Sequence, residues 1–138
     1  MTKVRKHVDV VAAVIENNQE YLCVQRGQHK YDYLARKYEF PGGKVEKDET
    51  PEAALQREIA EELLANISVE KLIIKVSHSY PDFDVTLKAF LCHFKDEVEF
   101  TLTEHINAKW LSCMELESVE WASADIPIVN KLKESEQI

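Results

Sequence analysis

The stretch GKVEKDETPEAALQREIAEELLA, residues 43–65, predicts a polar loop followed by an amphipathic helix. Thr50 is a candidate N-cap and Pro51 suits the first helical position, so the helix is expected to begin there. The pattern runs to about Leu64, and Asn66 can adopt the left-handed conformation that ends a helix. We therefore expect one well-defined helix near the middle of the chain.

One face of this helix is acidic. Glu58, Glu61 and Glu62 fall within about 100° of one another on a helical wheel. Like charges at these spacings repel by a few tenths of a kcal/mol per pair, and nothing local except a cation offsets that cost. Taken alone, such a face is more often a solvated surface than a metal site. The neighbouring apolar stripe, which can dock on a sheet, consists of Leu55, Ile59 and Leu63.

Length and composition predict a single globular domain over residues 1–138, because 45% of the residues are hydrophobic and 30% are charged. Acidic residues number 25 and basic residues 17, which gives a net charge of -8. That balance argues against a nucleic acid polymer or an anionic membrane as a partner. It does not exclude a phosphate ligand, because clustered carboxylates hold Mg²⁺ and the metal holds phosphates.

Strand patterns surround the central helix and predict an α+β fold in which helices pack on a mixed sheet. A polar loop is expected at residues 28–37, and residues 114–119 and 126–133 look helical. The expected strands are residues 8–15, 20–25, 38–40, 67–79, 84–94, 98–102 and 109–111, the first two forming a hairpin.

Two further patterns point to an ordinary cytoplasmic protein. The three cysteines lack CxxC spacing and lie beside apolar residues, so buried reduced thiols are expected. Neither a signal segment nor an apolar run long enough for a bilayer is visible. The histidines share no ligand spacing and are interpreted as surface or strand residues; they are His7, His29, His78, His93 and His105.

The central segment also resembles the box of the Nudix hydrolase family, G-x5-E-x7-R-E-U-x-E-E-x-G-U, where U is aliphatic. The fixed residues that match at the right spacing are Gly43, Glu49, Arg57, Glu58, Glu61 and Glu62. The chain departs from the pattern at the end, where Leu64 replaces the usual Gly and Ala65 an aliphatic residue. This departure concerns the helix cap and removes none of the acidic residues.

The resemblance implies an α-β-α sandwich whose loop-helix-loop binds Mg²⁺ or Mn²⁺. In that family's arrangement Arg57 holds Glu58 in position, and Gly43 and Glu49 support the loop. The implied reaction is metal-dependent hydrolysis of a nucleoside triphosphate to the monophosphate and pyrophosphate. The implied metal ligands are Glu58, Glu61, Glu62 and the backbone carbonyl of Gly42.

The resemblance extends beyond the box to the MutT-like members of the family. It rests on VVAAVI at residues 10–15, EFPGGKVE at 39–46, ADIP at 124–127, and a Glu six residues before Trp110. It implies that this Glu104 is a metal ligand or orients the attacking water, although a surface Glu in a turn is the simpler alternative. It also implies that Arg26 approaches the substrate.

Two residues are implied to contact the base, and each has a structural alternative. Asp125 would accept from an amino group if ionised and could also donate to an oxopurine if protonated; it could equally cap the last helix. Phe83 could stack on a base or be a plain sheet-edge aromatic. Phe40, in the shared EFPGGKVE string, is assigned to substrate binding.

We therefore expect a nucleotide-sanitising enzyme, monomeric or homodimeric, for substrates such as 8-oxo-dGTP or (d)CTP derivatives. One alternative is a non-catalytic Nudix-fold sensor, which loss of the box carboxylates would favour, and this chain keeps them. Another is a structural Ca²⁺ module, but GKVEKDE, residues 43–49, lacks the alternating Asp and Asn ligands of an EF-hand.

Overall fold

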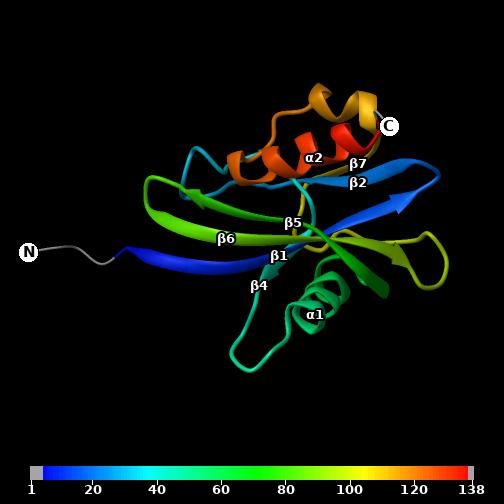
Figure 1. Cartoon of the computed structure of the whole chain (residues 1–138), viewed down its shortest axis with the longest axis horizontal. Coiled ribbons are helices and arrows are strands. Elements are labelled where there is room, and N and C mark those ends of the chain that lie inside the picture. The colour runs from blue at the N-terminus through cyan, green and yellow to red at the C-terminus, as the bar shows by residue number, and fades with distance from the viewer. Residues whose placement is uncertain (1–4, 137–138) are drawn as a thin grey trace, which may run out of the picture.

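The computed structural model describes residues 5–136, which form a mixed sheet between two helices. Figure 1 shows α1 (Pro51–Leu63) on one side of the sheet and α2 (Ile126–Glu136) on the other. The expected α+β sandwich is therefore confirmed. The strands are β1 (Lys6–Asn17), β2 (Glu20–Gln25), β3 (Tyr38–Glu39), β4 (Gly42–Lys44), β5 (Ile67–Ser79), β6 (Phe83–Phe94) and β7 (Asn107–Ser112). Two short 3-10 helices, η1 (Cys113–Ser118) and η2 (Ser123–Asp125), precede α2.

Strand β1 lies at the centre of the sheet, whose order is β3-β2-β1-β6-β5, with β4 paired to β1 and β7 to β2. It runs parallel to β6 and antiparallel to β2 and β4. Its apolar run is continuous because both of its faces are buried. Val11 and Ala13 pack into the core beneath α1, whereas Ala12 and Val14 pack into the core beneath α2.

Several sequence expectations were wrong in detail. Residues 98–102 form no strand; this segment instead closes the end of α1, where the Thr101 amide donates to the Leu63 carbonyl at 2.8 Å. Strand β4 was not expected, because Pro41-Gly42-Gly43 has the composition of a turn. The helical segment expected at residues 114–119 is present as η1, a 3-10 helix. The hairpin of β1 and β2 and the loop at 28–37 are confirmed.

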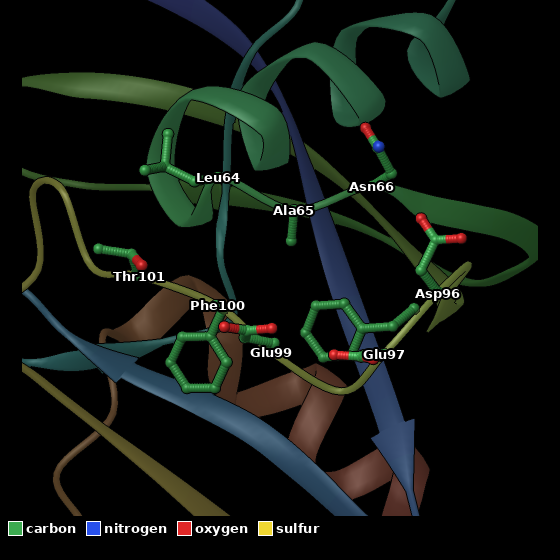
Figure 2. Close-up of a pocket in the computed structure, with 9 residues that line it drawn as sticks. Leu64, Ala65, Asn66, Asp96, Glu97, Glu99, Phe100 and Thr101 are labelled. Atoms are coloured by element: carbon green, nitrogen blue, oxygen red, sulfur yellow. The ribbon is translucent and has the colours of Figure 1, made fainter.

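The two ends of α1 differ in how well the sequence anticipates them. At the start, the Thr50 hydroxyl accepts a hydrogen bond from the Ala53 amide at 3.1 Å, as expected. At the end, Leu64 rather than Asn66 takes the left-handed conformation, with φ 52° and ψ 43°. Only three residues separate α1 from β5, so the reversal occurs at the first of them. Leu64 lies at the rim of a surface hollow whose facing wall is residues 96–101 (Figure 2).

The remaining sequence expectations concern thiols and membranes. All three cysteines are buried and none forms a disulfide, which confirms the expectation of buried thiols. Within the described residues, no helix is both long enough and apolar enough to span a bilayer.

Candidate active site

The site begins where β4 passes close to α1. A side chain at Gly43 would collide with the carboxylate of Glu58, and one at Gly42 would collide with the backbone of Val11. The paired glycines therefore let the β4 backbone lie directly between β1 and the acidic face of α1.

Arg57 organises the loop that leads into α1. Its Nε and Nη2 donate to the two carboxylate oxygens of Glu49 at 2.7 and 3.0 Å, and its Nη1 donates to Glu58 at 2.9 Å. Glu49 also accepts from the Glu46 amide at 2.9 Å. The Arg57 hydrogen bonds lower the pKa of Glu49 to about 2. Such a fork fixes carboxylate orientation more strictly than a single cation does.

Glu62 is the most deeply placed carboxylate of the helix. Its side chain is only 6% exposed, and one of its oxygens is buried without a hydrogen-bond partner within residues 5–136. Burial raises its pKa to about 9, and the nearby charges of Glu39, Glu58 and Glu104 add to this effect. A buried carboxylate in that setting is costly unless it takes up a proton or a cation.

The other box carboxylates lie around Glu62. Burial, and then the charges of Glu61 and Glu104, raise the pKa of Glu58 against the opposing effect of Arg57. Glu61 is more exposed and lies 3.6 Å from Arg57. The fold thus brings Glu104, from the loop before β7, close enough to Glu58 and Glu62 for its charge to raise the pKa of both.

This donor set consists of hard oxygens, which suits Mg²⁺ or Mn²⁺. Across the described part of the chain, no three His, Cys, Asp or Glu side chains stand close enough together to hold an ion as they are. Arg57 contacts one oxygen of Glu58, which faces the same cleft as Glu62. Glu61 lies beside Arg57 and outside the lining of that cleft, so its carboxylate would have to turn toward Glu62 to share an ion. The unpartnered buried oxygen of Glu62 is the feature that fits a cation best.

A cleft of 480 Å³, here called the carboxylate cleft, joins the box to the loop that follows β2. Arg26 enters it from the end of β2, and its Nε donates to Glu39 at 2.8 Å. The Nη atoms of Arg26 make no hydrogen bond to any described residue. They remain available to an anion in the cleft. The residues that line the carboxylate cleft include Arg26, Glu39, Gly43, Glu58, Glu62 and Glu104.

A second hollow, the inner cavity of 100 Å³, lies beside the first, and Asp125 forms part of its wall. Asp125 is 6% exposed, and its Oδ2 accepts from the Phe40 amide at 3.0 Å. Among the described residues its carboxylate makes no hydrogen bond to the first turn of α2, so it does not act as a cap. Burial raises the pKa of Asp125, and the charge of Glu39 adds to this, against Phe40 and Arg26.

Three aromatic rings, those of Phe40, Tyr80 and Phe83, line the inner cavity together with aliphatic side chains. Phe40 is buried and its ring lies 4.8 Å from that of Trp121. Phe83 is half-buried, and its ring lies 5.2 Å from that of Tyr80. Tyr31 of the 28–37 loop extends this cluster, with its ring 6.1 Å from Phe83. The expected substrate-binding residues Phe40, Phe83 and Asp125 therefore line one cavity.

Sequence reasoning missed three residues of the site. Glu39 lies between Arg26 and His105, and His105 Nε2 contacts it at 2.9 Å. Tyr80 accepts a hydrogen bond from the Ala124 amide at 2.9 Å inside the cavity wall. A charged residue directly before Phe40 and a histidine directly after Glu104 were the available signals.

Residues 5–132 match the model of the NUDIX domain, and the chain belongs to the Nudix hydrolase family. Over 129 residues it is 33% identical to an 8-oxo-dGTP diphosphatase of Escherichia coli, covering 93% of this chain and 98% of that one. It is also 33% identical to a CTP pyrophosphohydrolase of the same organism, covering 90% of each chain. A solved MutT structure from Staphylococcus aureus is 40% identical, with a TM-score of 0.73, covering 95% of this chain and 99% of that one.

Proposed function

We propose that this protein is a metal-dependent nucleoside triphosphate pyrophosphohydrolase. It converts a ribo- or deoxyribonucleoside triphosphate and water to the monophosphate and pyrophosphate. Its substrates are damaged or surplus nucleotides such as 8-oxo-dGTP or (d)CTP derivatives. The observation that carries the proposal is the buried, unpartnered oxygen of Glu62, which lies among like charges in an open cleft.

The carboxylate cleft supplies the reaction centre. Bound Mg²⁺ or Mn²⁺ would be held by Glu58, Glu61, Glu62, Glu104 and the Gly42 carbonyl, and would supply Lewis-acid polarisation and an activated water. Arg26 presents its Nη groups to the phosphates, since Glu39 occupies only its Nε. Arg57 keeps Glu58 facing the cleft through their hydrogen bond at 2.9 Å. Positioning and charge stabilisation are the main demands of phosphoryl transfer.

The inner cavity receives the base. The Asp125 carboxyl has one oxygen fixed by the Phe40 amide, which leaves the other for the ligand. Because burial favours its protonated form, this group can both donate and accept a hydrogen bond. Such a group matches the oxo edge of an oxidised purine and the amino edge of cytosine. The half-buried Phe83 ring offers a stacking face beside it.

Pyrophosphate release from a panel of nucleotides tests the proposal. We expect release from at least one of 8-oxo-dGTP, dGTP, dCTP, CTP and 5-methyl-dCTP with Mg²⁺, and none after chelation by EDTA. Adding excess Mg²⁺ back should restore it. A protein that binds these nucleotides but releases no pyrophosphate from any of them would instead be a sensor, and the enzymatic proposal would be wrong.

A further inference from the structure

Three charged or polar side chains from separate segments meet at the back of the carboxylate cleft. Arg26 follows β2, Glu39 belongs to β3, and His105 lies in the loop before β7. Glu39 accepts from Arg26 through Oε1 at 2.8 Å and contacts His105 through Oε2 at 2.9 Å. Both oxygens of one carboxylate thus connect two parts of the site that are far apart in the sequence.

The loop that carries Glu104 is fixed on both sides. Before Glu104, the Thr103 amide donates to the Glu62 carbonyl at 3.0 Å, and the Thr103 hydroxyl donates to the Glu61 carbonyl at 2.9 Å. After Glu104, the Ile106 amide donates to the Gln25 carbonyl at 3.0 Å. On this second side the His105 side chain, directly after Glu104, contacts Glu39, and two residues further on the Asn107 side-chain amide donates to the Tyr38 hydroxyl at 3.0 Å.

His105 is held in one orientation by this attachment. Its side chain is only 5% exposed. A carboxylate only accepts hydrogen bonds, so the His105 Nε2 carries a hydrogen and donates it in the hydrogen bond to Glu39. Its Nδ1 is buried without a partner within residues 5–136. A buried histidine that only packs usually has hydrogen-bond partners for both ring nitrogens. We therefore infer that Glu39 sets the orientation of His105, at the cost of leaving Nδ1 without a partner.

We propose that Glu39 and His105 are positioning residues that couple the substrate-binding Arg26 to the loop that presents Glu104. Glu39 orients the Arg26 guanidinium toward the phosphates through Nε, and through His105 it fixes the backbone beside Glu104. The proposal rests on the proposed function, because Arg26 and Glu104 are assigned their roles there. In this proposal both residues act through others, Glu39 through Arg26 and His105 through the backbone beside Glu104.

Paired substitutions of His105 distinguish positioning from packing. The amide nitrogen of Gln can occupy the place of the histidine Nε2, whereas that of Asn lies nearer the place of Nδ1. We expect His105→Leu and His105→Asn to lower kcat/KM by about 10- to 100-fold, the usual effect of losing a residue that orients a metal-site ligand. We expect His105→Gln to recover most of that loss. His7→Leu, an exposed histidine bound to Thr86, is the matched control and should change nothing.

The separate kinetic constants and metal binding supply independent readouts. The His105 variants should act mainly on kcat and weaken Mn²⁺ binding, measured by electron paramagnetic resonance without nucleotide. Glu39→Gln should also raise KM, because its amide cannot accept from both Arg26 and His105. The double variant Glu39→Gln/His105→Leu should lose no more activity than Glu39→Gln alone, since both act through one carboxylate.

The outcomes separate this proposal from the function on which it rests. An active wild type with His105→Leu and His105→Asn within twofold in kcat, KM and Mn²⁺ affinity overturns the positioning role alone. Equal loss in His105→Gln and His105→Leu also overturns it, because packing would then explain the effect. If His105→Leu fails to fold, His105→Asn against His105→Gln decides the question. A wild type inactive on every nucleotide overturns the proposed function, and the positioning role with it.

Discussion

The carboxylate cleft and the inner cavity are adjacent, yet the chain builds them in opposite ways. The acidic side of the cleft comes chiefly from one continuous stretch, residues 43–65, organised by Arg57. The inner cavity is assembled from segments far apart in sequence, as the hydrogen bond between Phe40 and Asp125 shows. A local motif therefore supplies most of the acidic groups of the cleft, whereas the walls of the inner cavity, where we propose that the base binds, depend on long-range packing.

The largest expected effect comes from the cleft. Glu62→Gln keeps the side-chain volume but removes the charge, so we expect kcat to fall by on the order of 100-fold or more, within the range for loss of a catalytic carboxylate. The rise in Tm that Mn²⁺ gives the wild type should disappear as well, because binding to the folded state causes that rise. Glu52→Gln, in the exposed first turn of α1, is the matched control. Activity retained by Glu62→Gln would show that the local motif does not define the chemistry.

Asp125→Asn tests whether the inner cavity determines which base is preferred. The Asn carbonyl can still accept from Phe40, which leaves an amino group, a donor only, facing the cavity. We expect kcat/KM for dCTP to fall relative to 8-oxo-dGTP by about 5- to 150-fold, the value of one well-formed pair of base contacts. Steady-state kinetics on both nucleotides measures this ratio, with exposed Asp96→Asn as control. An unchanged ratio would remove Asp125 from base recognition.

Substitutions of Leu64 test how the departure from the box pattern, which has Gly at this position, affects the end of α1. A Leu in the left-handed conformation costs about 1–2 kcal/mol of stability, and Gly would remove this cost. Part of the gain would be lost, because Gly has greater conformational freedom in the unfolded chain. We expect Leu64→Gly to stabilise the protein by about 0.5–1 kcal/mol, measured by chemical denaturation. Leu64→Ala keeps the same strain and should give no gain. Stabilisation by Ala equal to that by Gly would show that removal of the exposed side chain, not backbone strain, is responsible.

The smallest effect is expected away from both regions, at His93. The pKa of His93 is raised above 6.5 by its contact with Glu70 and by a second contact with Glu16. Burial opposes this shift without reversing it. A raised pKa means stabilisation that is fully present below pH 6.5 and lost as the pH rises through the folded-state value. His93→Gln should therefore lower Tm at pH 5.5 and lower it less at pH 9. A Tm difference that grows with pH would contradict this assignment.

The features that the sequence predicts correctly depend on contacts between residues close together in the chain, and the features that it misses depend on contacts between distant ones. The Thr50 cap and the α1 helix depend on neighbours within a few residues, and both were anticipated. The end of α1 was not, because the short connection to β5 overrides the intrinsic preference of Asn66. The contact between Glu39 and His105 spans 66 residues, and no local pattern announces it. Residues 98–102 alternate like a strand, yet their backbone serves the end of α1 instead.

Strand β1 has a consequence for how this enzyme can change. Ala12 lines the inner cavity, while its neighbour Ala13 packs beneath the helix that carries the carboxylates. A larger side chain at Ala12 would narrow the inner cavity, where we propose that the base binds, whereas one at Ala13 would displace α1. Two adjacent residues of one strand therefore face different parts of the molecule, and we expect substitutions at the two positions to affect different properties.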